Sequence, residues 1–184
     1  MTNNLNTLKS EHVCLRALEP TDLELLYIWE NDPAIWLVSG TLAPYSRFVL
    51  EQYLTSAHLD IYTHKQMRLM IDFFHNPTDG IGIPAGCIDL FDFDPKNKHA
   101  GIGILIGNKE LHNNHCASEA LQLLINFSFN TLDLHQLYCN ITTDNEISLH
   151  LFKKFGFEIT GLKQDWIFYN GKWHDEYLLQ LINK

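Results

Sequence analysis

The segment from His99 to Gly107 constrains the fold more than any other part of the chain. Alternate side chains of a strand point to opposite faces of a sheet. The two faces of this predicted strand carry Ala100, Ile102, Ile104 and Ile106 on one side, and Gly101, Gly103, Leu105 and Gly107 on the other. Because glycines weaken a strand interior, they often mark a close approach of a ligand or another backbone. The glycine-rich side is nearly bare of side chains, and this bare face predicts either a bound ligand or a helix packed tightly over the strand.

The hydrophobic pattern predicts further strands and helices around this segment. A period of two indicates strands, and apolar residues at i, i+3 and i+4 indicate helices. The predicted elements are a strand at 12–18, helices at 21–30 and from 46, strands at 66–74, 86–93 and 99–106, a helix after the loop 108–115, a strand at 136–141, a helix from 143 to 156, and strands at 157–169 and 173–181. This order predicts an α/β (α+β) fold, with one mixed, mostly antiparallel sheet and helices on both faces.

Local signals set the expected ends of several elements. Capping boxes at 21–24 and 143–146 predict two helix N-termini. Gly156 is a helix stop signal, and Asn170-Gly171 favours a type I′ hairpin turn. These signals predict a closing β-hairpin at the C-terminus.

The charge of the chain excludes some partners. Its 184 residues include 22 acidic and 13 basic side chains, for a formal net charge of −9. Such a charge repels phosphate backbones, and no stripe of lysine and arginine offsets it, so a nucleic-acid partner is not expected. A small-molecule amine or a basic peptide is electrostatically favoured. The sequence leaves the oligomeric state open, a homo-oligomer included.

We expect a single domain over residues 11–184, preceded by a flexible, Asn-rich tail at 1–10. No stretch approaches 18 uninterrupted apolar residues and no signal-peptide pattern opens the chain, so no membrane contact is expected. The four cysteines lie far apart without C-x-x-C spacing, which is typical of a reduced, cytoplasmic protein.

The helix after the loop 108–115 follows the glycine-lined strand directly. The first amides of a helix lack intrahelical partners, and the positive end of its dipole points the same way. This arrangement predicts an anion site suited to a pyrophosphate.

Two segments resemble the GNAT superfamily of acyl-CoA-dependent N-acetyltransferases. The family core is similar to the segment HCASEALQLLINFSFNTLDLHQLYCNITTDNEISLHLFKKFGFEITG. The closing hairpin of the spermidine and ribosomal-protein acetyltransferase branch is similar to the segment FYNGKWHDEYLLQL. The resemblance runs from about Val13 to Leu181. Its most specific part is the match of 144–146 followed by Lys154-x-Gly156-Phe157.

The resemblance implies a sheet that splays after its fourth strand, with coenzyme A in the gap. It also implies transfer of an acetyl group from acetyl-CoA to a primary amine, by direct attack in a ternary complex without a covalent enzyme intermediate. The acceptor classes left open are a polyamine, an amino sugar or aminoglycoside, and a protein N-terminus.

The resemblance further implies which residues bind the cosubstrate. Backbone groups of Ile104, Leu105 and Ile106 would bond the pantetheine arm, and Asn145 would bond its amide. A strand amide near Ile106 would stabilise the tetrahedral oxyanion. The pyrophosphate would lie against His112, Asn113, Asn114, His115, Cys116, Ala117 and Ser118.

The phosphate loop departs from the family pattern Arg/Gln-Gly-x-Gly-x-Ala, of which only Ala117 remains. Asparagine tolerates the positive φ that such a turn needs, so Asn113 and Asn114 are compatible with it. His115 either fills the phosphate site or, when protonated, donates a hydrogen bond to it. A metal site at His112-x-x-His115-Cys116 would lack a second ligand cluster, so no metal is expected.

Phe152 stands where many family members carry the tyrosine that protonates the departing thiolate. A thiol with a pKa of about 8.5 leaves as a thiolate at modest cost at pH 7. The substitution therefore slows the reaction without preventing it, unless Tyr138 or Cys116 supplies the proton. The alternative role of Phe152 is packing in the core.

The resemblance suggests Glu30 and Asp32 as candidates to bind the acceptor amine, because they lie at the end of the first helix, where the related polyamine enzymes place acidic substrate contacts. Asp89 and Asp92 in the meander are further candidates. Each is alternatively a solvated carboxylate. The rival function is a catalytically weak or silent binding or structural protein of GNAT fold, whose altered loop no longer holds coenzyme A well. Binding of acetyl-CoA separates the two functions.

Overall fold

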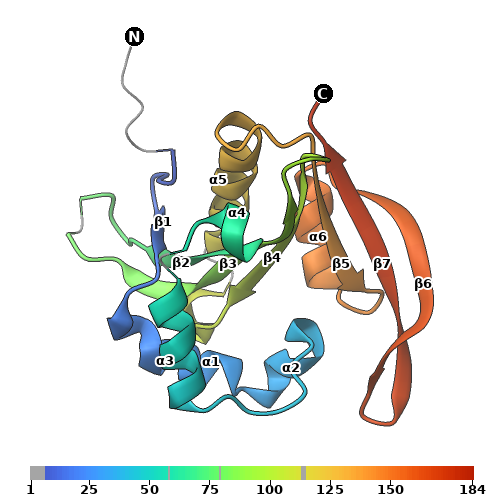
Figure 1. The fold of residues 1–184 in the computed structure, drawn as a ribbon, viewed down its shortest axis with the longest axis horizontal. Coiled ribbons are helices and arrows are strands. Elements are labelled where there is room, and N and C mark those ends of the chain that lie inside the picture. The colour runs from blue at the N-terminus through green and yellow to red at the C-terminus, as the bar shows by residue number, and fades with distance from the viewer. Residues whose placement is uncertain (1–6, 58, 79, 113–114) are drawn as a thin grey trace.

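The computed structural model describes residues 7–57, 59–78, 80–112 and 115–184, and it confirms the expected fold class (Figure 1). Seven strands form one sheet in the order β1-β2-β3-β4-β5-β7-β6. Every neighbouring pair is antiparallel except β4 and β5, which are parallel. The strands are β1 (Val13–Ala17), β2 (Met67–Phe73), β3 (Ile83–Asp94), β4 (His99–Ile106), β5 (Gln136–Thr142), β6 (Glu158–Tyr169) and β7 (Lys172–Ile182).

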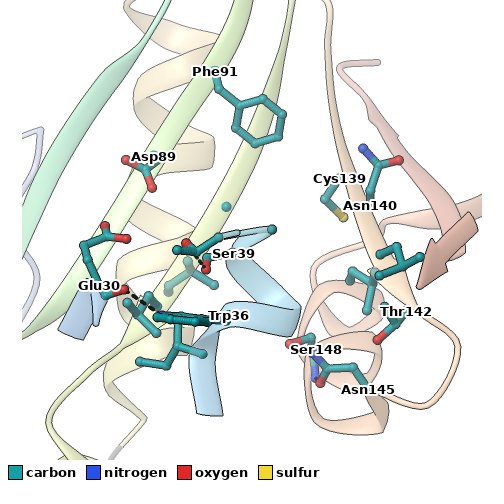
Figure 2. Close-up of a pocket in the computed structure, with 18 of the residues that line it drawn as sticks. Glu30, Trp36, Ser39, Asp89, Phe91, Cys139, Asn140, Thr142, Asn145 and Ser148 are labelled. Atoms are coloured by element: carbon teal, nitrogen blue, oxygen red, sulfur yellow. Dashed lines mark hydrogen bonds between the residues drawn. The ribbon is translucent and has the colours of Figure 1, made fainter. Parts of the chain in front are cut away.

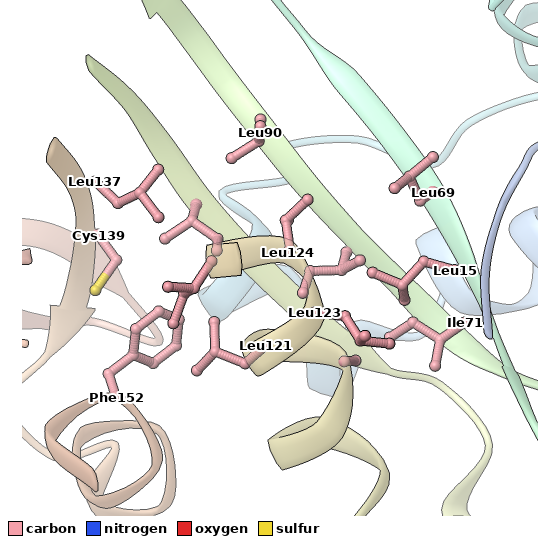
Figure 3. Packing of buried hydrophobic residues seen from close by; sticks show 14 of the residues in the cluster. Leu15, Leu69, Ile71, Leu90, Leu121, Leu123, Leu124, Leu137, Cys139 and Phe152 are labelled. Atoms are coloured by element: carbon pink, nitrogen blue, oxygen red, sulfur yellow. The ribbon is translucent and has the colours of Figure 1, made fainter. Parts of the chain in front are cut away.

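Helices cover both faces of the sheet. The longer ones are α1 (Leu23–Glu30), α3 (Arg47–Ser56), α5 (Cys116–Asn130) and α6 (Glu146–Lys154), and the shorter ones are η1 (Pro20–Asp22), α2 (Pro33–Ser39), α4 (Ile61–His64) and η2 (Lys109–Leu111). On one face α5 packs Leu121, Leu123 and Leu124 into the larger core (Figure 3). On the other face α1 and α3 form a smaller core with Met70 and Cys87. In the described part of the chain, no helix combines the length and hydrophobicity needed to cross a membrane.

The two-faced pattern predicted for β4 is confirmed. Ala100 and Ile102 are buried in the larger core. On the opposite face, a Cβ atom on Gly101 would lie 2.2 Å from Cε2 of Phe91, and one on Gly107 would lie 2.4 Å from Cδ2 of Trp29. Aromatic rings from β3 and α1 therefore occupy the space that side chains would need. At Gly107 the packed helix is present, because α1 lies over it, whereas Gly103 lines a cleft and the prediction of a ligand there stays a prediction.

The sheet splays between β4 and β5. Their parallel pairing covers three positions, from His99 opposite Gln136 to Gly101 opposite Tyr138. Beyond these residues the two strands diverge, while β4 stays paired to β3 as far as Ile106 (Figure 1). The edge of β4 from Ile102 onward thus faces a gap instead of a neighbouring strand.

Both predicted capping boxes are wrong, although the helices are present. At α1 the capping box joins Glu19 and Asp22 around η1, because Pro20 starts a 3₁₀ turn before the predicted Thr21. At α6 the N-cap is Asn145, whose side chain accepts a hydrogen bond from the N–H of Ser148 at 3.1 Å.

The ordered domain begins before residue 11. Ser10 Oγ donates to Glu119 Oε2 of α5 at 2.5 Å, and the N–H of Leu15 donates to the carbonyl of Leu8 at 2.8 Å. The expected tail at 1–10 therefore includes residues that pack on the domain, and residues 1–6 lie outside the described part. The predicted hairpin turn is confirmed, with φ of 48° at Asn170 and 75° at Gly171.

Candidate active site

The divergence of β4 from β5 opens a cleft of about 740 Å³. One wall comes from α1, β3 and β4, and the other from β5, α6 and the β6–β7 hairpin. Figure 2 shows Glu30, Asp89 and Phe91 on the first wall, facing Asn140, Thr142 and Asn145 on the second. Trp36 and Ser39 of α2 lie between the two walls at one end.

The cleft brings together six of the residues predicted from the sequence. They are Glu30, Asp89, Ile104, Leu105, Asn145 and Phe152. Asp32, Ile106, Tyr138 and the described residues of the predicted phosphate loop lie outside the lining. Asn113 and Asn114 fall outside the described residues, so their predicted role has no structural description.

The backbone at His115 has the conformation that a glycine usually supplies. His115 is the N-cap of α5 with φ of 57° and ψ of 1°, in the left-handed region, and its side chain makes no capping hydrogen bond. A non-glycine residue in this region costs about 1–2 kcal/mol. His115 thus has the left-handed backbone conformation that a glycine would have at this position of the phosphate loop. The N-terminus of α5 keeps the geometry that suits an anion.

His112 and Cys116 are committed to contacts within the protein. His112 Nε2 lies 3.1 Å from the carbonyl oxygen of Ile106, a distance that suits a hydrogen bond in the tautomer protonated at Nε2. Cys116 is 2% exposed, and burial raises the pKa of its thiol to about 12. Among the described residues, no group of three or more histidine, cysteine or acidic side chains is arranged to hold a metal ion.

A forked ion pair organises the first wall of the cleft. Arg68 of β2 donates from Nε and Nη2 to the two oxygens of Asp89, at 2.6 and 3.2 Å, and from Nη1 to Glu30 Oε1 at 2.5 Å. Burial raises the pKa of Asp89, and the attraction of Arg68 opposes that rise. With formal charges of +1 for Arg68 and −1 for each carboxylate, these three ion-paired side chains sum to a net charge of −1 on this wall.

Arg68 itself is held by its surroundings. Burial alone would lower the pKa of its guanidinium, but the Asp89 carboxylate raises it well above the ordinary value. Its guanidinium carbon also lies 5.6 Å from the ring centroid of Tyr53. Burial raises the pKa of Tyr53 to about 12, although the positive charge of Arg68 acts to lower it. Tyr53 therefore stays protonated at neutral pH and lines the cleft as a neutral aromatic group.

Asp32 has a different place from the one expected for a substrate contact. Its Oδ1 accepts the N–H of Ala34 at 2.9 Å and so caps α2, while its Oδ2 lies 3.0 Å from Lys109 Nζ. These two contacts lower the pKa of Asp32, with the backbone hydrogen bond as the larger cause. Asp32 orients α2 beside the cleft instead of lining it.

Tyr138 also lies apart from the cleft lining. Its hydroxyl donates to Asp92 Oδ2 at 3.0 Å, and burial, followed by this hydrogen bond, raises its pKa to about 12. Phe152 is the candidate that does reach the cleft. It is 3% exposed and packs edge to face on Phe157 at 5.0 Å between ring centroids, so it belongs to the core as well (Figure 3).

Several lining residues carry no signal in the sequence. Arg68 and Glu176 are single charged residues in alternating strands, where solvated side chains are the usual interpretation. Trp36 lies in α2, a helix of seven residues that was not predicted, and its Nε1 donates to the carbonyl of Glu30 at 3.0 Å. The N-cap Asp32 followed by Pro33 is the signal from which α2 could have been predicted.

Comparisons with known proteins agree with this geometry. Residues 12–158 match the acetyltransferase (GNAT) domain family. The spermidine N(1)-acetyltransferase of Escherichia coli K12 is 25% identical over 166 residues, which cover 89% of this chain and 82% of the relative. The putative ribosomal N-acetyltransferase YdaF of Bacillus subtilis is 27% identical over 188 residues, covering 95% of this chain and 93% of the relative.

A solved structure shares the fold over nearly the whole chain. The spermidine N-acetyltransferase of Vibrio cholerae, in complex with CoA and spermine, superposes with a TM-score of 0.81 at 21% identity, covering 92% of this chain and 95% of that one. The family match covers most of the domain, and the splayed sheet is the one that the resemblance implied. The chain belongs to the GNAT family of acetyltransferases.

Proposed function

We propose that the protein transfers the acetyl group of acetyl-CoA to a primary amine of a polyamine. The observation that carries this proposal is that one cleft joins the unpaired edge of β4 to a wall with a formal net negative charge. Relatives named as spermidine acetyltransferases support the acceptor class. The amino sugar, aminoglycoside and protein N-terminus remain the alternatives that an acceptor panel must include.

Acetyl-CoA would bind in the cleft and extend beyond its lining to the end of β4 and the N-terminus of α5. The pantetheine arm would bond the backbone of β4 at Ile104, Leu105 and Ile106, and the side chain of Asn145 across the gap. The pyrophosphate would lie at the N-terminus of α5, where residues 115–118 present backbone amides. The thioester supplies the electrophilic carbonyl carbon.

The acceptor amine would bind at the wall formed by Glu30 and Asp89. An alkylammonium has a pKa of about 10.4, so it arrives protonated and must lose a proton before it attacks. A carboxylate on this wall, directly or through water, accepts that proton. The amine nitrogen then forms a bond to the carbonyl carbon, the C–S bond breaks, and the electron pair leaves on sulfur.

The wall formed by Glu30 and Asp89, here called the acceptor wall, also has aromatic side chains around it that can bind a cation. Trp36, Tyr45 and Tyr53 line the cleft beside Glu30. Aromatic faces attract ammonium groups, by about 0.5–1 kcal/mol where exposed and more where desolvated. The apolar surface of these three rings favours contact with the methylene segments of a polyamine over contact with a strongly hydrated sugar.

Two measurements test the proposal. Acetyl-CoA should raise the melting temperature, since a ligand at 100 times its dissociation constant stabilises by about 2.7 kcal/mol. Thiol release should then be measured with spermidine, an aminoglycoside and a peptide N-terminus, and spermidine should give the highest kcat/KM. No thermal shift at millimolar acetyl-CoA would overturn the proposal in favour of a silent binding protein of the same fold.

A matched pair of variants links the activity to the acceptor wall. Glu30→Gln should raise KM for spermidine, because it removes a carboxylate from the cleft. Glu51→Gln on the exposed face of α3 should leave KM unchanged. Equal effects of both variants would show that Glu30 does not bind the acceptor.

A further inference from the structure

Glu176 is a buried carboxylate on the wall opposite Glu30 and Asp89. It lies on β7, in register with Thr142 of β5, and only 8% of its surface is exposed. It lines the cleft together with Asn140 and Thr142. A charged side chain this deeply buried needs a partner.

Lys163 of β6 supplies that partner from the solvent side. Its Nζ lies 2.8 Å from Glu176 Oε2 and 2.8 Å from Asn140 Oδ1. The side chain of Lys163 is 31% exposed and that of Glu176 is 11% exposed, so the negative end of the pair is the inner one. Glu176 Oε1 has no hydrogen-bond donor among the described residues. The carboxylate is therefore fixed in place with one oxygen left for a ligand.

The two walls offer carboxylate oxygens to two different positive charges. An amine that reacts at the wall of Asp89 needs only the carboxylates there. A second ammonium group on the same molecule needs a carboxylate elsewhere in the cleft, and Glu176 is placed across it. Ile167 and Phe168 of β6 also line the cleft and supply apolar surface for the methylene segment between two charges.

We propose that Glu176 is a specificity-determining residue, which binds the second ammonium group of a multiply charged acceptor. This inference rests on the proposed acetyl transfer to an amine. It predicts that Glu176 contributes to the binding of a triamine and not to the binding of a monoamine. The positive charge of Lys163 offsets the negative charge that attracts the acceptor to the other oxygen of Glu176, so its removal should have the opposite effect.

The test compares spermidine with butylamine as acceptors for the full-length protein. Glu176→Gln should raise KM for spermidine at least fivefold, with kcat retained, and should change KM for butylamine less than twofold. Lys163→Met should lower KM for spermidine. Glu158→Gln, on the exposed surface of the same hairpin, is the matched control and should change neither value.

Calorimetry separates failure of this inference from failure of the proposed function. Spermidine is titrated into the protein saturated with CoA, with thermal melts to show that each variant is folded. If the wild type transfers no acetyl group to either amine, the proposed function fails, and binding of spermidine still reports on Glu176. Equal losses for both amines in Glu176→Gln, or spermidine binding unchanged by that substitution, overturn the inference.

Discussion

The ring of Phe91 lies directly over Gly101, at the last position where β4 pairs with β5. A Cβ atom on Gly101 would come within 2.2 Å of the ring, whereas one on Gly103 would lie 3.7 Å from it. Phe91 also lines the cleft. Its ring therefore fills the bare face of β4 at the point where the sheet begins to splay.

Gly101→Ala should push the Phe91 ring toward the cleft. Overpacking of this kind costs about 1–3 kcal/mol of unfolding free energy, and the displaced ring should also weaken acetyl-CoA binding. Gly103→Ala is the control for stability alone, because its methyl group would make only an ordinary contact with Phe91 but would lie in the cleft lining. Chemical denaturation and calorimetry measure the two effects. Equal destabilisation by both substitutions would contradict the role given to Phe91.

His115→Gly should stabilise the protein by about 0.5–1 kcal/mol, because it relieves the cost of a left-handed residue while adding freedom to the unfolded chain. It should also tighten acetyl-CoA binding, because it removes the bulk of the imidazole from the N-terminus of α5, where the pyrophosphate would lie.

A control for the strain is available elsewhere in the chain. Lys65 has nearly the same backbone conformation, with φ of 58° at the end of α4. Lys65→Gly should therefore gain stability without any change in acetyl-CoA affinity. If His115→Gly changes stability alone, as Lys65→Gly does, the side chain of His115 points away from the pyrophosphate.

The fold could be predicted from the sequence because its signals are local. The two-residue period of β4, the helical stripe of α5 and the turn at Asn170-Gly171 each depend on neighbours in the chain. The capping boxes were predicted on the same basis and failed, because Pro20 starts a 3₁₀ turn ahead of Thr21, and Asn145 instead of Thr143 caps α6.

Glu30 and Asp89 were predicted from the sequence as acceptor contacts, but the arginine that joins them was not. Glu30, Arg68 and Asp89 lie on three different elements: the sheet register makes Arg68 of β2 the cross-strand partner of Asp89, and Glu30 reaches Arg68 from α1. Asp32 shows the converse error. Its carboxylate was predicted to contact the substrate, but it instead caps the N-terminus of α2 by accepting the N–H of Ala34.

Arg68→Met should cost about 2–3 kcal/mol of stability, somewhat less than the loss of a partner from a fully buried pair. Burial already raises the pKa of Asp89, and Arg68 is the group that opposes this rise. When Arg68 is removed, the pKa of Asp89 rises further. Asp89 then becomes protonated at a higher pH than in the parent. The acidic limb of kcat/KM for spermidine should accordingly move to higher pH.

The matched control for this prediction is Arg47→Met. Arg47 pairs with Glu24 on the surface between α1 and α3, where both side chains are more than half exposed. Such pairs contribute about 0–1 kcal/mol, so this variant should keep both the stability and the pH profile of the parent. A parental pH profile in Arg68→Met would show that Asp89 does not act in the reaction.

Phe152→Tyr tests whether a tyrosine at this position can act as the general acid that protonates the departing thiolate. Phe152 both packs on Phe157 and lines the cleft, so a hydroxyl added to its ring would lie beside the cleft in which we propose that the thiolate departs. With spermidine as acceptor, we expect a higher turnover at little cost in stability, since a general acid contributes about 10²–10⁴-fold where proton transfer limits the rate. The gain should fade above the thiol pKa of about 8.5, because the thiolate then needs no proton.

Phe157→Tyr is the matched control, because Phe157 is 2% exposed in the same aromatic pair and does not line the cleft. An unpartnered hydroxyl in the core costs about 1–3 kcal/mol, so this variant should lose stability and keep the parental rate. The same outcome in Phe152→Tyr would show that the Phe152 ring is a core residue only. Solvent would then be the source of the proton, because Tyr138 is bound to Asp92 and Cys116 is buried with a pKa of about 12.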